Sequence, residues 1–394
     1  MELGNRTSEM QFSSQSMPSN FPKPLHSMHL RTIAVLLGLL PLIVGCSDAP
    51  VQDGLGAGQE TFASQRDMVH IGQARRYLAA GETAKARQEL QGLSEDAQDA
   101  AMYLLLAEAD LRDSRINSAM ESINKAADLE PDNAEVDMLR GLVFESTGNW
   151  LDASRAYLTA SNKDRDNIVP VLANARVLHA QGDVTRAASY LERELAARPI
   201  DFELSMAAGD VFMAIGSHFD AITHYSTAVD MQPEHLPARE GLILALSLAG
   251  MHVEALERAQ DLDVADISPM LRLAIGRSAL LADDPQRAAS MLTSYLFEFS
   301  KDASAWLDLA RAYFLSGKDE LAISAVGRTL KIRAQDPAAY TLLGHIRLRS
   351  GQHTLAFAAY EHAILAGGDA ILLTELMEGV QKKAAAAAAK EREL

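Results

Sequence analysis

Small, apolar and turn-forming residues recur along this chain with a period of 33 or 34 residues. One column of the repeat is always alanine, and it contains Ala86, Ala119, Ala153, Ala187, Ala221, Ala255, Ala288, Ala322 and Ala356. Alanine is common in this sequence, so two or three matches would mean little. Nine alanines in one register indicate an internal repeat.

Three further columns accompany the alanines. Twelve residues earlier stands a mostly small column of Ala74, Ala107, Gly141, Ala175, Gly209, Ile243, Gly276, Ala310 and Gly344. Five residues earlier stands a turn column of Gly81, Ser114, Gly148, Gly182, Gly216, Gly250, Asp283, Gly317 and Gly351. Four residues later stands a mostly bulky column of Leu90, Ile123, Tyr157, Leu191, Tyr225, Ala259, Leu292, Val326 and Tyr360. Glycine readily adopts the positive φ that ends a helix, so each repeat predicts two antiparallel helices joined by a tight turn.

This pattern resembles the tetratricopeptide repeat, whose eighth and twentieth positions are small. Trp306, Tyr103 and Tyr340 match its frequent aromatic residue at the fourth position, and Pro131, Pro199 and Pro233 match its proline near the end. The resemblance covers residues 67–370 and implies an all-α fold, a right-handed α-solenoid of about nine helix hairpins. Its repeats are predicted to start near residues 67, 100, 134, 168, 202, 236, 269, 303 and 337. Residues 371–394 predict a C-terminal capping helix followed by an alanine-rich and charged tail.

The sixth repeat is the least regular, with Ile243 in the small column and Ala259 in the bulky one. Its second helix runs into the acidic segment 261–266, where a bend or loosened packing is expected.

The N-terminal part has a different composition. Residues 28–45 have a basic start, a short apolar core and a small residue before Cys46, which is the layout of a secretory signal. The apolar core is shorter than the about 20 residues that a membrane-spanning helix needs. Residues 1–27 lack periodicity, and we interpret them as a non-native extension upstream of a start at Met28 or Met17.

Ile43-Val44-Gly45-Cys46 resembles the lipobox of bacterial lipoprotein signals. The resemblance implies that Cys46, the only cysteine, takes a diacylglycerol and becomes the mature N-terminus. The alternative is an uncleaved apolar N-terminus. Residues 46–66 are rich in glycine and polar residues, so they predict a lipidated cysteine followed by a flexible tether. Ser47 after the cysteine implies, by the same resemblance, an outer-membrane location facing the periplasm.

Charge and composition restrict the partners. The net charge of −17 argues against nucleic acid and against broad electrostatic binding to anionic lipid. The sequence contains no phosphate-binding loop, zinc-protease motif or nucleophile elbow, and its histidines are scattered. We therefore predict a protein that is not an enzyme, with no catalytic residues, no metal, no cofactor and no small-molecule substrate.

The tetratricopeptide resemblance implies a concave groove lined by the first helix of each hairpin, which accepts proteins or peptides. Its fifth, ninth and twelfth positions alternate between leucine or methionine and isolated arginines, a mixture that suits a peptide or a partner helix. The C-terminal repeats are predicted to bind most selectively. The predicted groove residues are Met206, Leu273, Arg277, Leu280, Leu307, Arg311, Phe314 and His345.

Two alternatives for this stripe stay open. The leucines could be core residues between tightly wound repeats, and the arginines could be paired with Asp308, Glu320 and their neighbours.

Together these features predict a membrane-anchored scaffold lipoprotein of the cell envelope that binds protein partners. By family association, the process would be pilus or secretin assembly or exopolysaccharide export. The alternative is a docking regulator of peptidoglycan-processing enzymes.

Overall fold

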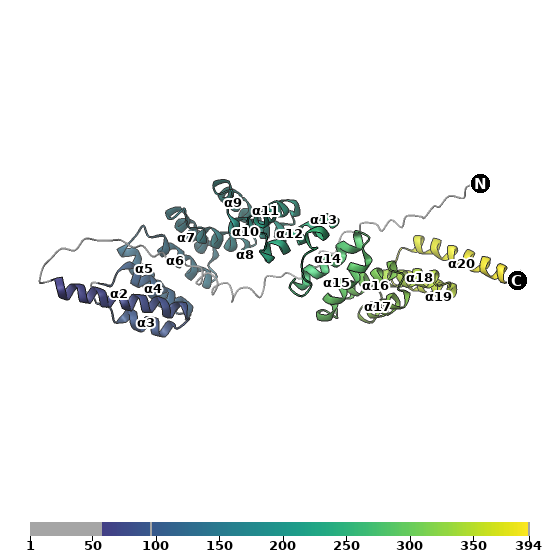
Figure 1. Cartoon of the computed structure of the whole chain (residues 1–394), viewed down its shortest axis with the longest axis horizontal. Coiled ribbons are helices and arrows are strands. Elements are labelled where there is room, and N and C mark those ends of the chain that lie inside the picture. Colours follow the sequence, from purple (N-terminus) through teal and green to yellow (C-terminus); the bar gives the residue numbers. More distant parts are fainter. Residues whose placement is uncertain (1–56, 95–96, 393–394) are drawn as a thin grey trace. The chain divides into compact units, whose positions relative to one another are not determined.

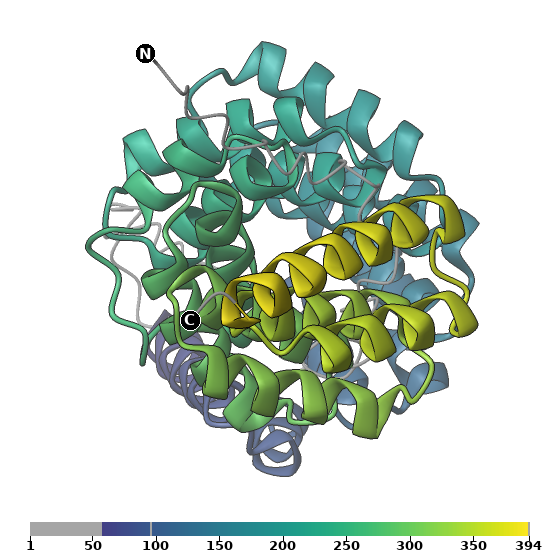
Figure 2. The same cartoon turned by 90° about the vertical axis from the view of Figure 1, so that its right-hand side faces the viewer.

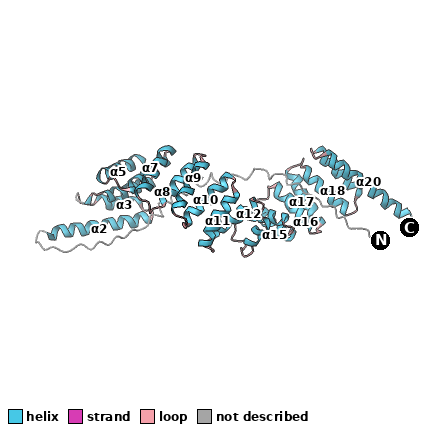
Figure 3. Ribbon diagram, turned by 90° about the horizontal axis from the view of Figure 1, so that it is seen from above, coloured by secondary structure: helices cyan, strands magenta, loops and turns pink. Residues whose placement is uncertain are grey.

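The computed structural model describes residues 57–94 and 97–392, and these residues form helices and no strand (Figure 3). Cys46, the signal segment 28–45 and the residues before it lie outside the described part. The chain divides into two compact units, the first ending at Arg165 and the second beginning at Asp166. Each unit is built from consecutive helix hairpins (Figure 1).

Unit 1 contains three hairpins. They are formed by α2 (Ala57–Ala79) with α3 (Thr83–Gln91), α4 (Ala100–Arg112) with α5 (Ile116–Leu129), and α6 (Ala134–Ser146) with α7 (Trp150–Lys163). Helix α2 begins ten residues before the predicted repeat start at 67, so the prediction of a tether reaching residue 66 was wrong for residues 57–66. The run from Gln59 to Ile71 contains no glycine or proline, so nothing in it stops the helix.

Unit 2 contains six hairpins and a final helix. The hairpins are α8 (Val169–Ala180) with α9 (Val184–Ala197), α10 (Phe202–Ile215) with α11 (His218–Met231), α12 (Leu236–Leu248) with α13 (His252–Arg258), α14 (Pro269–Leu281) with α15 (Pro285–Glu298), α16 (Ala303–Leu315) with α17 (Asp319–Ile332), and α18 (Pro337–Arg349) with α19 (His353–Leu365). The last helix, α20 (Ala370–Arg392), packs on α19 and buries Leu373 and Val380 (Figure 2). The all-α fold, the hairpins and the capping helix are thus as predicted.

Local sequence explains where each helix starts and stops. The turn glycines adopt positive φ, and Ser114 and Asp283, which replace glycine in that column, adopt it too, at φ of 58° and 60°. Several first helices begin with a side-chain cap: Asp99 accepts a hydrogen bond from the Met102 amide at 2.8 Å, and Asp336 accepts one from the Ala339 amide at 2.9 Å.

The helix crossings explain the small and bulky columns. The nine alanines of the repeat are fully buried, and the bulky column is buried as well. Where the bulky residue is tyrosine, the small residue is glycine: a Cβ atom added to Gly141 would lie 2.5 Å from Cε1 of Tyr157. Alanine faces most of the smaller bulky residues, as in Ala175 with Leu191. At each crossing, a smaller residue on the first helix thus compensates for a larger one on the second helix, so that the summed side-chain volume stays similar.

The sixth hairpin follows the same rule with its residues exchanged. Ile243 is fully buried on α12, and Ala259 directly after α13 is 2% exposed, so the large residue has moved to the first helix. Helix α13 has only 7 residues and ends at Arg258, before the acidic segment 261–266; the bend or loosened packing expected in that segment stays a prediction. Two hydrogen bonds hold the loop that follows: the Ser268 amide donates to Glu240 Oε1 at 2.7 Å, and Arg272 Nε donates to the Val264 carbonyl at 3.0 Å.

Candidate partner-binding face

The first helices of unit 2 form one continuous layer. Successive first helices contact one another directly, from α8 to α10 and onward through α12, α14, α16 and α18. Each second helix also packs against the first helix of the following hairpin, as α11 does on α12 and α15 on α16. We call the layer of first helices the inner face. The fifth, ninth and twelfth positions of each repeat lie on these helices.

The fifth positions contribute more to packing than to open surface. Leu273 and Leu307 are only 5% and 6% exposed, and Leu307 packs in a cluster with Ile346 and Ala322. They are therefore core residues between neighbouring repeats, and the prediction that both offer groove surface was wrong. Met206, Leu280 and Phe314 remain half-buried and still offer apolar surface.

The two predicted arginines meet at a single carboxylate. Arg277 Nε lies 2.9 Å from Asp308 Oδ2, and Arg311 Nη1 lies 3.0 Å from Asp308 Oδ1. Asp308 is 9% exposed, so its charge is neutralised where it is buried. Two guanidinium groups on one carboxylate leave one positive charge in excess. The remaining N–H groups of both arginines are available to an anion, because a guanidinium carries five donors.

The other basic residues nearby are each paired. Arg272 lies 2.6 Å from Glu298, and Arg349 binds Asp319 while its guanidinium stacks 3.9 Å from the centre of the Phe314 ring. The alternative reading of these arginines as ion-paired groups is therefore largely correct. Among the arginines named above, Arg277 and Arg311 differ in that they share one carboxylate, which leaves an excess of positive charge.

His345 completes the row of ninth positions on α14, α16 and α18. Burial lowers the pKa of His345, so it is neutral near pH 7. Its ring packs edge-on against Tyr360, with ring centres 5.6 Å apart. The hydroxyl of Tyr360 is buried without a hydrogen-bond partner in the described residues, and burial raises its pKa to about 12.

Equivalent tyrosines in other repeats do find partners on the first helix. Tyr157 Oη donates to Glu145 Oε2 at 2.7 Å, and Tyr225 Oη donates to Asp210 Oδ1 at 2.6 Å. Sequence reasoning missed these bonds. The spacings of 12 and 15 residues were visible, but the residue columns do not tell which first-helix position a hydroxyl reaches.

The first helices of unit 1 carry more acidic side chains than the first helices of unit 2. Glu108 is 8% exposed and its carboxylate lies 2.6 Å from Arg112, while burial raises the pKa of Glu108. Glu135 on α6 also has a raised pKa, because the surrounding helices partly desolvate its carboxylate although the residue is exposed, and because the Glu108 charge is near. Charged residues thus distinguish the first helices of the two units.

Between 57 and 392, apart from 95 and 96, no group of three or more histidine, cysteine, aspartate or glutamate side chains is arranged to hold a metal ion. Within the same ranges, no helix has both the length and the apolar character needed to cross a membrane.

Comparisons with known proteins agree with the helix hairpins. Three family models, each described as tetratricopeptide repeat, match residues 172–235, 279–346 and 337–366. Cellulose synthase operon protein C of Xanthomonas axonopodis pv. citri is 25% identical over 330 residues, which cover 76% of this chain and 20% of that protein. The chain thus spans about a fifth of the length of this curated relative.

Solved structures with similar architecture include a tetratricopeptide repeat protein from Parabacteroides merdae, which is 16% identical with a TM-score of 0.37 over 72% of this chain and 99% of that one. Another is pilF of Pseudomonas aeruginosa, which is 17% identical with a TM-score of 0.42 over 60% of this chain and 94% of that one.

Proposed function

Because this chain belongs to the tetratricopeptide-repeat proteins, which are interaction scaffolds, we propose that it is a lipid-anchored adaptor of the bacterial cell envelope. It binds a protein partner along the inner face of unit 2 and performs no catalysis itself. The process it serves is exopolysaccharide export at the periplasmic side of the outer membrane. The likeness to cellulose synthase operon protein C over 76% of this chain supports this choice of process.

The observation that carries the proposal is the Arg277–Asp308–Arg311 cluster beside half-buried apolar side chains. A partner that brings a carboxylate to the two guanidinium groups restores charge balance, and planar guanidinium groups bind carboxylates through paired hydrogen bonds. Leu280 and Phe314 lie on the same two helices, three residues beyond the arginines, and supply apolar contact. The partner segment is therefore acidic and amphipathic.

The test removes the excess charge without leaving a buried carboxylate unpaired. Arg277→Gln, Arg311→Gln and Asp308→Asn are combined in one variant, which keeps side-chain shape and neutralises all three groups. Recovery of the partner from crosslinked envelopes is expected to fall by at least about tenfold, the effect of losing an interface hot spot. Arg186→Gln, on the exposed surface of α9, is the matched control.

Circular dichroism and melting temperature check that the combined variant folds like the wild type. Unchanged recovery from the combined variant, together with loss of recovery in Met206→Glu, would move the binding site to the N-terminal hairpins of unit 2. Recovery of peptidoglycan-processing enzymes in place of export components would replace the proposed process with enzyme docking.

The lipid anchor is tested separately at Cys46. Metabolic labelling with an alkyne fatty acid is expected for the wild type and not for Cys46→Ser. Equal labelling of both proteins would refute the anchor while leaving the proposed binding face intact.

A further inference from the structure

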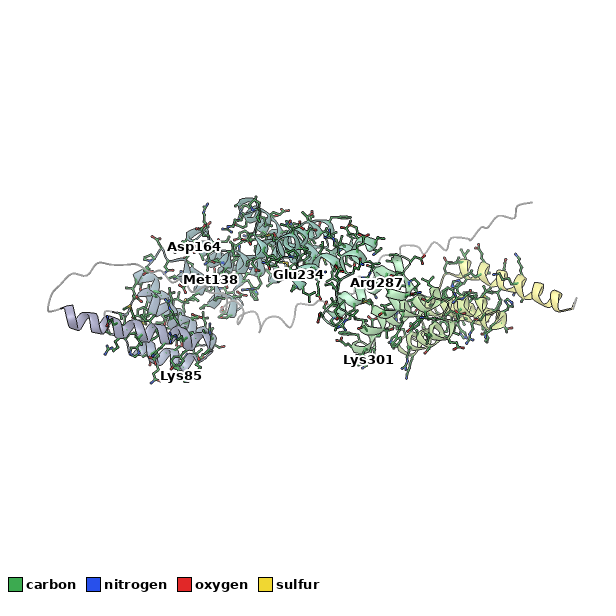
Figure 4. The ribbon with its side chains drawn as sticks, in the orientation of Figure 1. Lys85, Met138, Asp164, Glu234, Arg287 and Lys301 are labelled. Carbon is green, nitrogen blue, oxygen red and sulfur yellow. The ribbon has the colours of Figure 1, made fainter. Side chains whose placement is uncertain are left out.

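The second helices α15 and α17 end in exposed apolar and basic side chains. We define the aromatic–basic edge as Phe297, Phe299, Lys301, Arg328, Lys331 and Ile332. Phe297 is 91% exposed, the highest value among the exposed large apolar side chains of the described residues, and Phe299 and Ile332 are 46% and 41% exposed. Lys301 lies at the lower edge of unit 2 in Figure 4. This edge is separate from the inner face.

Side-chain contacts join the turn after α15 to the end of α17. Arg333, next to Ile332, donates from Nη2 to Ser304 Oγ at 3.3 Å. The Arg328 guanidinium lies 6.0 Å from the centre of the Trp306 ring, whose Nε1 donates to the Ser300 carbonyl at 2.9 Å. The end of α17 is therefore fixed against the turn that carries Phe299 and Lys301.

The acidic residues near this edge already form ion pairs or cap a helix. Glu298 pairs with Arg272 at 2.6 Å, and Asp336 pairs with Arg333 at 3.1 Å. Asp302 caps α16 through the amides of Ser304 and Ala305. The exposed lysines 301 and 331 have no carboxylate partner in the described residues, so the edge carries a local positive charge.

The corresponding edge of the two preceding hairpins has the opposite character. After α11 it reads Gln232-Pro233-Glu234, and after α13 it contains Asp261, Asp263 and Asp266. These residues include no exposed large apolar side chain. The repeat architecture therefore does not require the aromatic–basic edge, since the same place in unit 2 tolerates acidic residues.

We propose that the aromatic–basic edge docks on an anionic phospholipid surface. Exposed phenylalanine side chains such as Phe297 enter the boundary between headgroups and acyl chains, while lysine and arginine bind lipid phosphates. The chain carries a net charge of −17, so the rest of the protein is repelled by the same membrane. Docking through this edge alone would orient unit 2 on the membrane, in addition to any anchor at Cys46.

A dye attached to the edge tests the proposal in the full chain. Cys46 is the only cysteine, so Cys46→Ser combined with Phe297→Cys leaves one thiol for an environment-sensitive nitrobenzoxadiazole dye and removes the acylation site. Vesicles of phosphatidylethanolamine and phosphatidylglycerol are expected to shift the emission to the blue and raise its intensity. Vesicles of phosphatidylcholine alone are expected to leave it unchanged.

The matched control places the dye on another exposed phenylalanine of unit 2. Phe219 on α11 is 67% exposed, and Cys46→Ser with Phe219→Cys is expected to give no response to either vesicle. Equal responses at both positions, or no response at 297, would overturn the proposal. A response at 297 that requires an added protein and is absent with vesicles would assign the edge to a protein partner and also overturn it.

The contribution of charge is tested at the two lysines. Lys301→Glu and Lys331→Glu are each expected to weaken vesicle affinity by roughly fivefold or more, the effect of one basic residue near an anionic surface. Lys85→Glu, an exposed lysine of unit 1 (Figure 4), is expected to leave the affinity unchanged. An equal loss for all three variants would show general charge repulsion and refute docking through this edge.

Discussion

The fifth and ninth hairpins, α10–α11 and α18–α19, place the same pair of residues at their crossings. A Cβ atom on Gly209 would lie 2.6 Å from Cε1 of Tyr225, and Gly344 makes the same close approach to Tyr360. The tyrosine hydroxyls have different surroundings, because the residue 15 positions earlier is Asp210 in one hairpin and His345 in the other. Tyr225 donates to Asp210 at 2.6 Å, whereas Tyr360 has no partner in the described residues.

The difference shows that volume and hydrogen bonding are specified independently at these crossings. Glycine beside tyrosine fixes how closely the helices approach, in both hairpins. The first-helix residue at the ninth position then determines whether the buried hydroxyl is satisfied. Substitution on the inner face therefore changes the stability of the hairpin behind it.

The largest expected effect comes from converting the fifth hairpin to the packing of the sixth. Tyr225→Ala alone should cost about 3–5 kcal/mol through the cavity it leaves. Gly209→Ile alone should cost about 1–3 kcal/mol or more through overpacking. The double variant reproduces the Ile243 and Ala259 arrangement and should cost well under the sum, measured by urea unfolding. Additive costs would refute volume exchange at the crossing.

Removing the tyrosine hydroxyl should change the stability of the protein differently in the fifth and ninth hairpins. Tyr225→Phe loses the bond to Asp210 and should cost about 1 kcal/mol. Tyr360→Phe removes a buried hydroxyl that has no partner and should leave stability unchanged or slightly higher. Unfolding free energies of both variants provide the measurement, and equal losses would contradict the comparison.

Supplying the missing acceptor should make the ninth hairpin resemble the fifth. His345→Asp places a carboxylate at the position that Asp210 occupies relative to Tyr225, and should stabilise the protein by about 0.5–1.5 kcal/mol. The gain should vanish when Tyr360→Phe is also present. A gain that persists in the double variant would show that the aspartate acts without the hydroxyl.

The smallest effect is the contribution of His345 to the pH dependence of stability. Burial lowers the pKa of His345 in the folded state below its ordinary value of 6.5, so the unfolded state takes up the proton first as the pH falls. The stability that His345 contributes should therefore decrease below about pH 6.5 and stop decreasing once His345 is protonated in the folded state as well. His345→Gln should show a smaller decrease in melting temperature between neutral and mildly acidic pH, and an identical decrease would exclude this contribution.

The sequence predicted the repeat register closely. First helices begin at Ala100, Ala134, Phe202, Leu236, Pro269, Ala303 and Pro337, which are the predicted starting residues. Helix α8 begins one residue late, at Val169. The prediction succeeds because each crossing and turn depends on residues within one hairpin. The start of the first helix, α2, was predicted too late, because residues 57–66 precede the columns of the repeat.

The inner face could be predicted only in part. Its residues were correctly placed on first helices, but the burial of Leu273 and Leu307 depends on how closely neighbouring first helices pack. The pairing of Arg277 with Asp308 joins residues 31 positions apart, in adjacent hairpins. A column of residue types records the position within a repeat and does not record which side chain of the next repeat lies opposite.

The sequence by itself thus determined the helical repeat, its turns and the volume at each crossing, because these depend on contacts that recur every 33 or 34 residues. The tertiary structure decided which inner-face side chains stay accessible, where two arginines share one carboxylate, and which tyrosine hydroxyl lacks a partner. Those outcomes depend on distances between particular side chains of neighbouring helices, where a single residue such as Asp210 or His345 changes the result.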